Sequence, residues 1–259
     1  MRHLPELGDH RLDGLTVVIP SAGRAATCGA TVRLFPDPLL CVAESEAELY
    51  RRACPGTRLL THPDDLPGMV KKRQFILDRV DSEAVLMVDD DVDALLCLVG
   101  QRTRRLTDPD TVLQVVEQTA RLAKGLGTCL FGYAHTANPK HYHAFAPLRF
   151  TGYVNGLACG FVGRDPAVRF DARLTTHADI DISLQALLVR RIVLLDERFA
   201  FRTTKFFTRT GGMARIRTTE VMRADVAYLK RKWGDAVEIR RWERPKAGGR
   251  RSVSLHVVR

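Results

Sequence analysis

The stretch Val85-Leu86-Met87-Val88-Asp89-Asp90-Asp91-Val92-Asp93 decides the architecture. Its four leading apolar residues predict a buried strand of the kind found in a parallel sheet covered on both faces. The three consecutive carboxylates that follow repel one another unless a cation or hydrogen-bond donors hold them. Because open α/β sheets bind ligands at the carboxyl ends of their strands, we interpret this junction as a candidate site for a hard metal ion. The alternative is a solvated acidic turn that caps a helix.

The composition is that of a globular protein, with 45% hydrophobic and 27% charged residues. A chain of 259 residues can form one α/β domain with a full core. It has no run of about 18 apolar residues and no apolar stretch of signal-peptide type at the N-terminus, so we expect neither a membrane span nor secretion. The six cysteines form no CxxC pair, which argues against a zinc site and for a reducing compartment.

Positive charge is concentrated toward the C-terminus. Residues 202–259 hold 16 Lys or Arg and 5 Asp or Glu, whereas the first 201 residues hold 24 and 25. A nearly neutral body with a basic end suggests a polyanionic partner, nucleic acid foremost. An anionic membrane surface and a merely soluble basic surface are the alternatives.

Apolar runs predict strands that alternate with helices, and therefore an α/β fold. We expect strands at 15–20, 39–42, 57–60, 85–88, 129–133 and 192–195, and helices at 44–53, 68–80, 109–124, from about 179, and at 219–233. The stretch 150–163 should form one or two strands with a close backbone approach at Gly156 or Gly160. Residues 201–218 are interpreted as a basic loop, and 236–258 as two strands about a Gly-Gly turn.

Two groups of cations are candidates for an anion site. The turn Ser21-Ala22-Gly23-Arg24 lets backbone N–H groups approach an anion, although it also fits an ordinary strand-to-helix turn. Lys71-Lys72-Arg73 lies in the first turns of a predicted helix, where positive charge opposes the helix dipole. Such a local conflict is typical of an anion-binding site; a solvated basic face is the alternative.

Two further stretches are candidates for functional roles. Asp179 and Asp181 fall at the start of a predicted helix, where they are either capping carboxylates or a catalytic base. The irregular stretch 134–146 contains His135, His141 and His143 with no carboxylate between them. We therefore interpret it as a mobile loop near the site rather than as a metal site.

Five motifs, in this order between about residues 15 and 220, are similar to the TET-associated glycosyltransferase family. They are Ile19-Pro20-Ser21-Ala22-Gly23-Arg24, Glu46-Ala47-Glu48-Leu49-Tyr50, Lys72-Arg73-Gln74-Phe75-Ile76-Leu77, Met87-Val88-Asp89-Asp90-Asp91-Val92 and Asp179-Ile180-Asp181-Ile182-Ser183-Leu184-Gln185. Asp89-Asp90-Asp91 resembles the DxD motif of GT-A-type nucleotide-sugar glycosyltransferases. The family is associated mainly with bacteriophages and is thought to glycosylate hydroxymethylated bases in DNA, such as 5-hydroxymethylcytosine.

The resemblance implies a metal-dependent glycosyltransferase with Mn²⁺ or Mg²⁺ and a nucleotide-sugar donor, a UDP-sugar foremost. Asp91 is the first choice as metal ligand, with Asp89 as second ligand or ribose contact. Asp179 is the first choice as general base, in an inverting displacement, with Asp181 as the second catalytic carboxylate. Candidate donor-binding residues are Pro20, Ser21, Gly23, Arg24, Lys72, Arg73, Asp89 and Asp90. The chain departs from the family at Ala178, where related enzymes usually carry a glutamate.

The same resemblance implies one GT-A-like domain over 1–259, with a mostly parallel central sheet flanked by helices and a C-terminal basic helix and β-hairpin. Residues 15–200 would form the nucleotide-sugar-binding core and 201–259 a basic extension that binds the acceptor, double-stranded DNA. Candidate acceptor contacts are His177, Arg209, Arg215, Arg217, Arg240 and Arg241. We expect a monomer without a membrane partner, in the cytoplasm of an infected bacterial host cell.

Two other function classes stay open. A nucleotidyltransferase would share the sheet and the carboxylates but release pyrophosphate. A non-catalytic nucleic-acid-binding domain would account for the basic end but not for the acidic run. Release of nucleoside diphosphate, of pyrophosphate or of neither separates the three.

Overall fold

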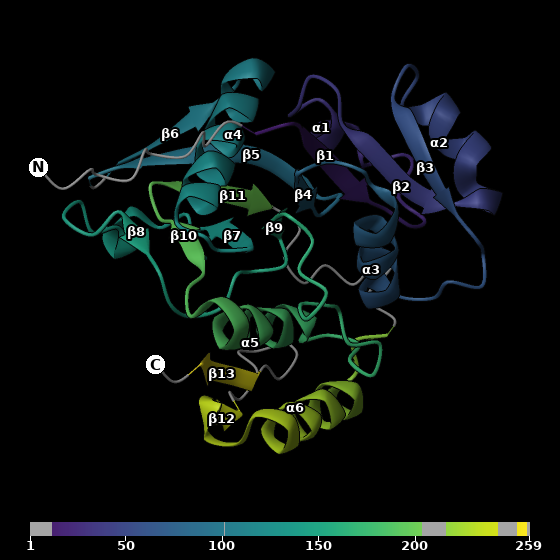
Figure 1. Ribbon diagram of the computed structural model, residues 1–259. Coiled ribbons are helices and arrows are strands. Elements are labelled where there is room, and N and C mark those ends of the chain that lie inside the picture. Colours follow the sequence, from purple (N-terminus) through teal and green to yellow (C-terminus); the bar gives the residue numbers. More distant parts are fainter. Residues whose placement is uncertain (1–11, 101, 204–215, 243–252, 258–259) are drawn as a thin grey trace, which may run out of the picture.

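The computed structural model describes residues 12–100, 102–203, 216–242 and 253–257, with side-chain surroundings described as far as residue 238. Its central sheet has eight strands in the order β3-β2-β1-β4-β9-β7-β10-β8 (Figure 1). Their bounds are β1 Leu15–Pro20, β2 Leu39–Ala43, β3 Arg58–His62, β4 Ala84–Val88, β7 Leu130–Tyr133, β8 Leu148–Arg149, β9 Ala158–Val162 and β10 Leu194–Asp196. The α/β fold class predicted from the alternating pattern is confirmed.

The direction of the strands determines where the functional residues meet. β1 runs parallel to both β2 and β4, and β2 runs parallel to β3. β9 lies antiparallel between β4 and β7, while β10 is parallel to β7 and β8 closes the edge antiparallel to β10. The parallel half therefore brings the carboxyl ends of β1 and β4 to one sheet edge, where Ser21 and Asp89 follow the two strands.

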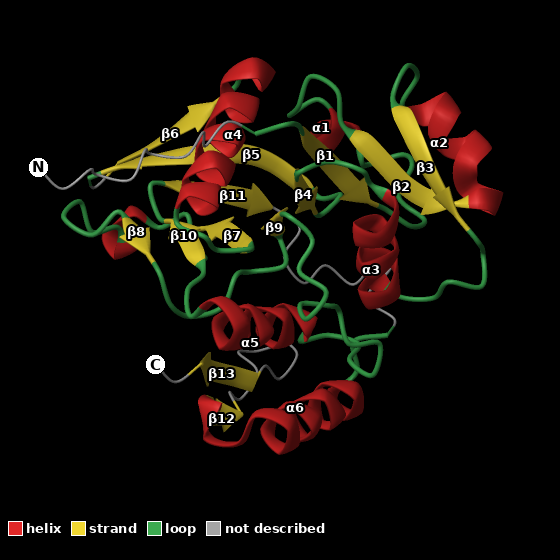
Figure 2. Ribbon diagram, viewed as in Figure 1, coloured by secondary structure: helices red, strands yellow, loops and turns green. Residues whose placement is uncertain are grey.

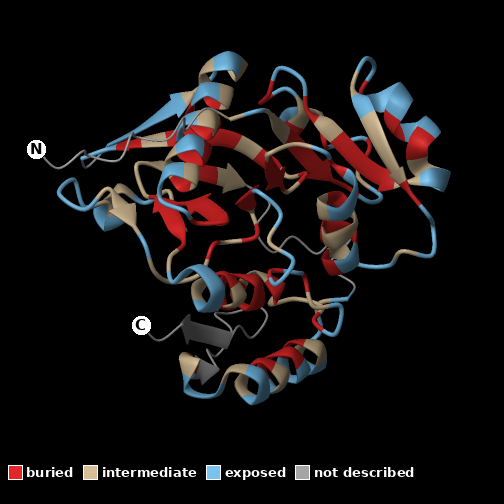
Figure 3. Cartoon of the chain, in the orientation of Figure 1, coloured by how far each residue is buried: buried red, intermediate tan, exposed pale blue. Residues whose placement is uncertain are grey.

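Helices cover both faces of this sheet (Figures 1 and 2). The helices are α1 Gly29–Val32, α2 Ala47–Ala53, α3 Met69–Arg79, α4 Pro109–Gly125, α5 Ala178–Arg190 and α6 Thr219–Trp233. One apolar cluster contains the inner face of α4, and another contains the inner faces of α3 and α5 together with Leu229 of α6. Figure 3 shows the same pattern, with buried residues along the sheet and on the inward faces of the helices. The all-apolar β4 is buried along its whole length because it lies between these two layers.

Gly160 lets the middle of the sheet pack tightly. A Cβ atom at this position of β9 would lie 2.0 Å from the ring of Phe131, which is fully buried on the neighbouring β7. No such contact is possible between real atoms, so only glycine fits. The predicted close backbone approach at Gly156 or Gly160 is confirmed, and it occurs at both positions.

A second sheet has the order β11-β5-β6, with β5 Val92–Val99, β6 Arg102–Leu106 and β11 Phe199–Thr203. The expectation of a loop from residue 201 is wrong at its start, because Phe201 and Arg202 pair with Leu95 and Ala94. The pairing buries Phe201 against Phe35 and Tyr133. β11 thus runs across the boundary expected between residues 200 and 201.

The C-terminal helix and hairpin are present as expected, as α6 and the antiparallel pair β12 Val237–Trp242 and β13 Val253–Val257. Throughout the described ranges, no helix combines the length and the apolarity that crossing a membrane requires.

Candidate active site

The acidic run after β4 is held by cations from two other segments. Asp89 accepts a hydrogen bond from Arg73 at 2.7 Å. Asp90 and Asp91 share one nitrogen of Arg24, at 2.6 and 2.9 Å. The charge repulsion within the run is therefore offset by two guanidinium groups, which is the condition for packing consecutive carboxylates side by side.

The three aspartates have different surroundings. Asp90 is buried and accepts a hydrogen bond of 2.5 Å from the Ser21 hydroxyl, so it faces into the protein. Burial raises the pKa of Asp89 to about 6, against the opposing effect of Arg73 and with a further upward contribution from Asp91. The side chains of Asp89 and Asp91 are more exposed than that of Asp90, at 33% and 17% against 8%.

These two carboxylates fit a divalent cation only in combination with a ligand. Asp89 Oδ2 and Asp91 Oδ1 have no hydrogen-bond partner among the residues that the structure describes. Within the same residues, no group of three or more His, Cys, Asp or Glu side chains is arranged to hold a metal ion alone. Mg²⁺ is commonly bound by one or two carboxylates and completed by substrate phosphates. The donor set at β4 fits an ion of that kind.

Buried side chains hold the turn after β1. Ser21 is fully buried, and its hydroxyl contacts both Asp90 and the Tyr50 hydroxyl, the latter at 2.6 Å. The Lys72 ammonium donates to the Ser21 carbonyl at 2.5 Å, and Tyr50 accepts from the Arg24 backbone N–H at 3.0 Å. Lys72 is only 4% exposed, and burial lowers its pKa. These contacts give the turn a single conformation.

The position of Arg73 joins the acidic run to the loop before β9. Its Nη2 donates to Asp89 Oδ1 and also, at 2.6 Å, to the Gly156 carbonyl. A Cβ atom at Gly156 would lie 2.6 Å from Arg73 Nη1, so glycine is required at this position for the guanidinium to fit. Burial tends to lower the pKa of Arg73, but the charges of neighbouring groups, Asp89 and Asp179 among them, outweigh it and raise that pKa. Two cations at the start of α3, Lys72 and Arg73, thus point inward to the site, against the helix dipole.

Asp179 also contacts Gly156. It lies in the first turn of α5, and its Oδ2 accepts a 3.3 Å hydrogen bond from the Gly156 backbone N–H. Its Oδ1 accepts from the Ile180 N–H at 3.0 Å. Gly156 therefore contacts Arg73 through its carbonyl and Asp179 through its N–H, and brings the two predicted acidic motifs together.

Asp181 has a different environment from Asp179. It is fully buried and accepts hydrogen bonds from Trp233 Nε1 at 2.7 Å and Gln185 Nε2 at 2.6 Å. An ion pair of 2.7 Å with Lys232 balances its charge. Both of its oxygens are thus occupied by partners on α5 and α6.

Sequence reasoning missed the contribution of α6 to this site. Asp225 of α6 accepts from the backbone N–H groups of Thr175, at 3.1 Å, and Thr176, at 2.6 Å, and from the Thr176 hydroxyl at 2.6 Å. Burial acts to raise the pKa of Asp225, but hydrogen bonds outweigh it and lower that pKa. On the next turns, Tyr228 and Lys232 bind Asp171 at 2.7 and 2.9 Å. The helix therefore holds the segment that leads into Asp179, and only its spacing of polar residues signals this.

The predicted acceptor contacts are spread over several surroundings. His177 is half-buried at the N-terminus of α5, with Nδ1 2.7 Å from the Thr176 hydroxyl. Arg217 is half-buried just before α6. Arg240 and Arg241 lie on β12, where the structure describes the backbone, and Arg209 and Arg215 lie outside the described residues. Of the other cations in the basic region, Arg202 pairs with Asp93, and Lys230 with Asp235.

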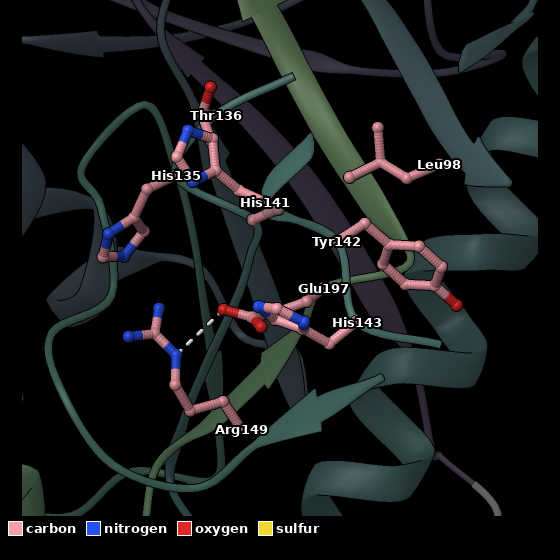
Figure 4. Close-up of a pocket in the computed structure, with 9 residues that line it drawn as sticks. Leu98, His135, Thr136, His141, Tyr142, His143, Arg149 and Glu197 are labelled. Atoms are coloured by element: carbon pink, nitrogen blue, oxygen red, sulfur yellow. Dashed lines mark ion pairs between the residues drawn. The ribbon is translucent and has the colours of Figure 1, made fainter. Parts of the chain in front are cut away.

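A cavity of about 310 Å³ opens on the side of β7 and β8 (Figure 4). Its walls include His135, His141, Tyr142, His143, Arg149 and Glu197. His135 packs against Tyr153, at 4.4 Å between ring centroids. Burial lowers the pKa of His135 and raises the pKa of Tyr153; the charge of Asp179 opposes the first shift and adds to the second. The lining of a smaller cavity includes His135 and the two chain neighbours of Gly156, Asn155 and Leu157. That the stretch with the three histidines is a mobile loop near the site stays a prediction.

With this geometry established, comparison with known proteins identifies the family. Residues 15–212 match the family described as TET-Associated Glycosyltransferase. The chain belongs to this family. No match is found among curated proteins. The five motifs named above all lie within the matched residues, and α6 lies beyond them.

Solved structures show the same fold at low sequence identity. S. aureus TarS 1-349 in complex with UDP-GlcNAc has 13% identity and a TM-score of 0.51, over 83% of this chain and 66% of that one. A mycobacterial protein has 12% identity and a TM-score of 0.50, over 94% and 83%. Glucosyl-3-phosphoglycerate synthase from Mycobacterium tuberculosis, in complex with Mn²⁺, UDP and glucosyl-3-phosphoglycerate, has 14% identity and a TM-score of 0.48, over 84% and 79%. The chain spans slightly less than two thirds of the TarS chain. The fold is of the GT-A type.

Proposed function

We propose that this protein transfers a sugar from a nucleotide-sugar donor to the hydroxymethyl group of a modified base in double-stranded DNA, with 5-hydroxymethylcytosine as the first candidate. The observation that carries the proposal is the meeting of Asp89 and Asp179 around Gly156 and Arg73, in a chain of this family. Carboxylates that can hold a metal ion and a carboxylate able to act as base are the two requirements of such a transfer.

The donor diphosphate is proposed to lie over the carboxyl ends of β1 and β4. A UDP-sugar is the first candidate, as UDP-GlcNAc is bound in the TarS complex. Asp91 and Asp89 would hold Mn²⁺ or Mg²⁺ through their free oxygens. When bound, the ion would stabilise negative charge on the departing diphosphate. Arg24 is the most exposed of these three cations, and we assign it to bind the donor diphosphate. Lys72 and Arg73 are buried and would contribute positive charge without contacting the donor.

The acceptor alcohol is proposed to lose its proton to Asp179. Its oxygen forms a bond to the anomeric carbon, the bond from that carbon to the diphosphate breaks, and the nucleoside diphosphate leaves with the electron pair. We assign the base to Asp179 rather than to Asp181, because both oxygens of Asp181 are enclosed by α5 and α6. A single displacement of this kind inverts the configuration at the sugar carbon.

The acceptor DNA would be held by positive charge. Besides the basic C-terminal region, Arg102 and Arg104 are exposed on β6, the strand that pairs with β5. Lys140 is exposed beside His141, which lines the 310 Å³ cavity. Cations of this kind would bind phosphates without selecting sequence.

The test is mass spectrometry of hydroxymethylated duplex DNA incubated with a panel of nucleotide sugars and Mg²⁺ or Mn²⁺. The expected result is a mass increase of one sugar per modified base, with release of nucleoside diphosphate, that disappears with excess chelator. Asp91→Asn keeps the shape of the side chain and removes its charge, and should abolish transfer while the protein stays folded. Transfer that survives both chelator and Asp91→Asn would exclude the proposed metal role, and release of pyrophosphate would exclude the reaction.

A further inference from the structure

The segment between β7 and β8, residues 134–147, is held in a defined shape at both ends. The Ala134 N–H donates to the Phe199 carbonyl at 2.9 Å, and the Glu197 N–H donates to the Pro147 carbonyl at 2.9 Å. Between them, the short helix η2 Pro139–His141 is capped by Asn138, and the Ala146 N–H donates to the His143 carbonyl at 3.0 Å. We call residues 134–147 the histidine loop.

Near the end of this loop stands Phe145, whose side chain is 104% exposed. Burying an aromatic ring of this size is strongly favourable, so Phe145 offers apolar area that a partner could cover. Phe145 lies within the turn closed by His143 and Ala146, and His143 lines the 310 Å³ cavity. An exposed apolar residue thus lies two positions from the cavity wall, and His135 of that wall also lines the smaller cavity beside the neighbours of Gly156.

The interior of the cavity has the groups needed to recognise a heterocycle. Arg149 and Glu197 form an ion pair of 2.9 Å between Nε and Oε1, which sets a guanidinium and a carboxylate side by side in the cavity wall. Figure 4 shows the rings of His135 and Tyr142 on opposite sides of this pair. A cytosine edge offers an amino donor next to acceptors, which matches a carboxylate next to a guanidinium. A volume of about 310 Å³ is in the range of ligand pockets.

We propose that the histidine loop extracts the acceptor base from the double helix: Phe145 enters the base stack, and the displaced base enters the cavity between His135 and Tyr142, against Arg149 and Glu197. This inference rests on the proposed function. The C5 hydroxymethyl group of a stacked cytosine points into the major groove. The base itself can enter the cavity only if it leaves the stack. Apolar side chains inserted at a base step stabilise such a distortion.

The test compares one oligonucleotide with a single 5-hydroxymethylcytosine as a paired duplex and as a single strand. In Phe145→Ala, transfer to the duplex should fall by about 5- to 150-fold, which is the factor for about 1–3 kcal/mol of stacking. Transfer to the single strand should stay within about twofold of the wild type, since no stack has to be opened. Phe145→Trp should retain transfer to the duplex. Leu49→Ala, which removes another exposed apolar side chain at the far end of the molecule on α2, should change neither.

A second readout reports base extrusion without catalysis. A duplex with 2-aminopurine at the target position should gain fluorescence when the wild type binds, and should not with Phe145→Ala. Equal losses on duplex and single strand, or no loss on either, would overturn the role of Phe145. Glu197→Gln should lower transfer to both substrates, and unchanged transfer to the single strand would overturn the assignment of the cavity. Failure of the proposed function looks different, because the wild type would then modify neither substrate with any donor.

Discussion

Replacing Asp225 by alanine tests whether α6 holds the segment before Asp179. The change removes the acceptor for the Thr175 and Thr176 backbone N–H groups and for the Thr176 hydroxyl, which lie 2.6–3.1 Å from the carboxylate. A buried donor left without a partner costs about 1–3 kcal/mol. These donors are half-buried, so we take the lower value for each and expect a loss of about 3 kcal/mol in the free energy of unfolding.

For a chain of this size, about 1 kcal/mol corresponds to about 2–4 °C in Tm, so the expected decrease is about 6–12 °C. The measurement is thermal unfolding followed by circular dichroism, at neutral pH and without ligand. Asp235→Ala is the matched control: it also removes an aspartate near α6, but Asp235 is fully exposed and its partner is Lys230 on the surface. Its Tm should equal that of the wild type. A Tm for Asp225→Ala within about 1 °C of this control would refute the reasoning.

Two further results are expected. The pKa of Asp225 is lower in the folded protein than its usual value of about 4. The stability that Asp225 contributes is therefore complete above that value and is lost as the pH falls through the folded pKa. In acid titrations followed by circular dichroism, Asp225→Asn should lose less stability between about pH 5 and pH 2 than the wild type, and equal slopes would contradict this. Gly156→Ala places a methyl group 2.6 Å from Arg73 Nη1, so transfer should fall at least tenfold while the circular dichroism spectrum stays unchanged. The control is Gly29→Ala, whose methyl group meets only the flexible end of Arg33 and should leave transfer unchanged.

Local pattern is sufficient to predict the centre of the fold. The apolar run of β4 and its end at the carboxylates can be located from the sequence, because burial on both faces and charge repulsion leave few alternatives for such a stretch. The close approaches at Gly156 and Gly160 are also predictable, since a glycine among apolar strand residues favours tight backbone packing. These features depend on neighbours in the chain or on one dominant physical effect.

The rest of the site depends on contacts between segments far apart in the chain. The periodicity of apolar residues in the sequence does not reveal such contacts. The sequence at the start of β11 does not show that it is a strand. Its pairing partner, β5, lies about 100 residues earlier in the chain, so the pairing leaves no local pattern. The spacing of Asp225, Tyr228 and Lys232 marks a polar face of α6, but it does not identify the backbone before α5 as the partner of Asp225. The cavity combines the histidine loop with Leu98 and Glu197, which belong to three separate segments.

The ion pair between Asp181 and Lys232 has a consequence for how this protein diverges from its relatives. Asp181 lies within the residues that match the family, while Lys232 lies beyond them. A carboxylate enclosed without its counter-charge is strongly destabilising, so neither position can change freely on its own. Homologues without a basic residue at the place of Lys232 should therefore have a neutral side chain at the place of Asp181, and the two positions should covary. A chain shortened to residue 212 would retain the Asp181 carboxylate and lose its counter-charge, Lys232. We therefore expect the matched region to be less stable without α6.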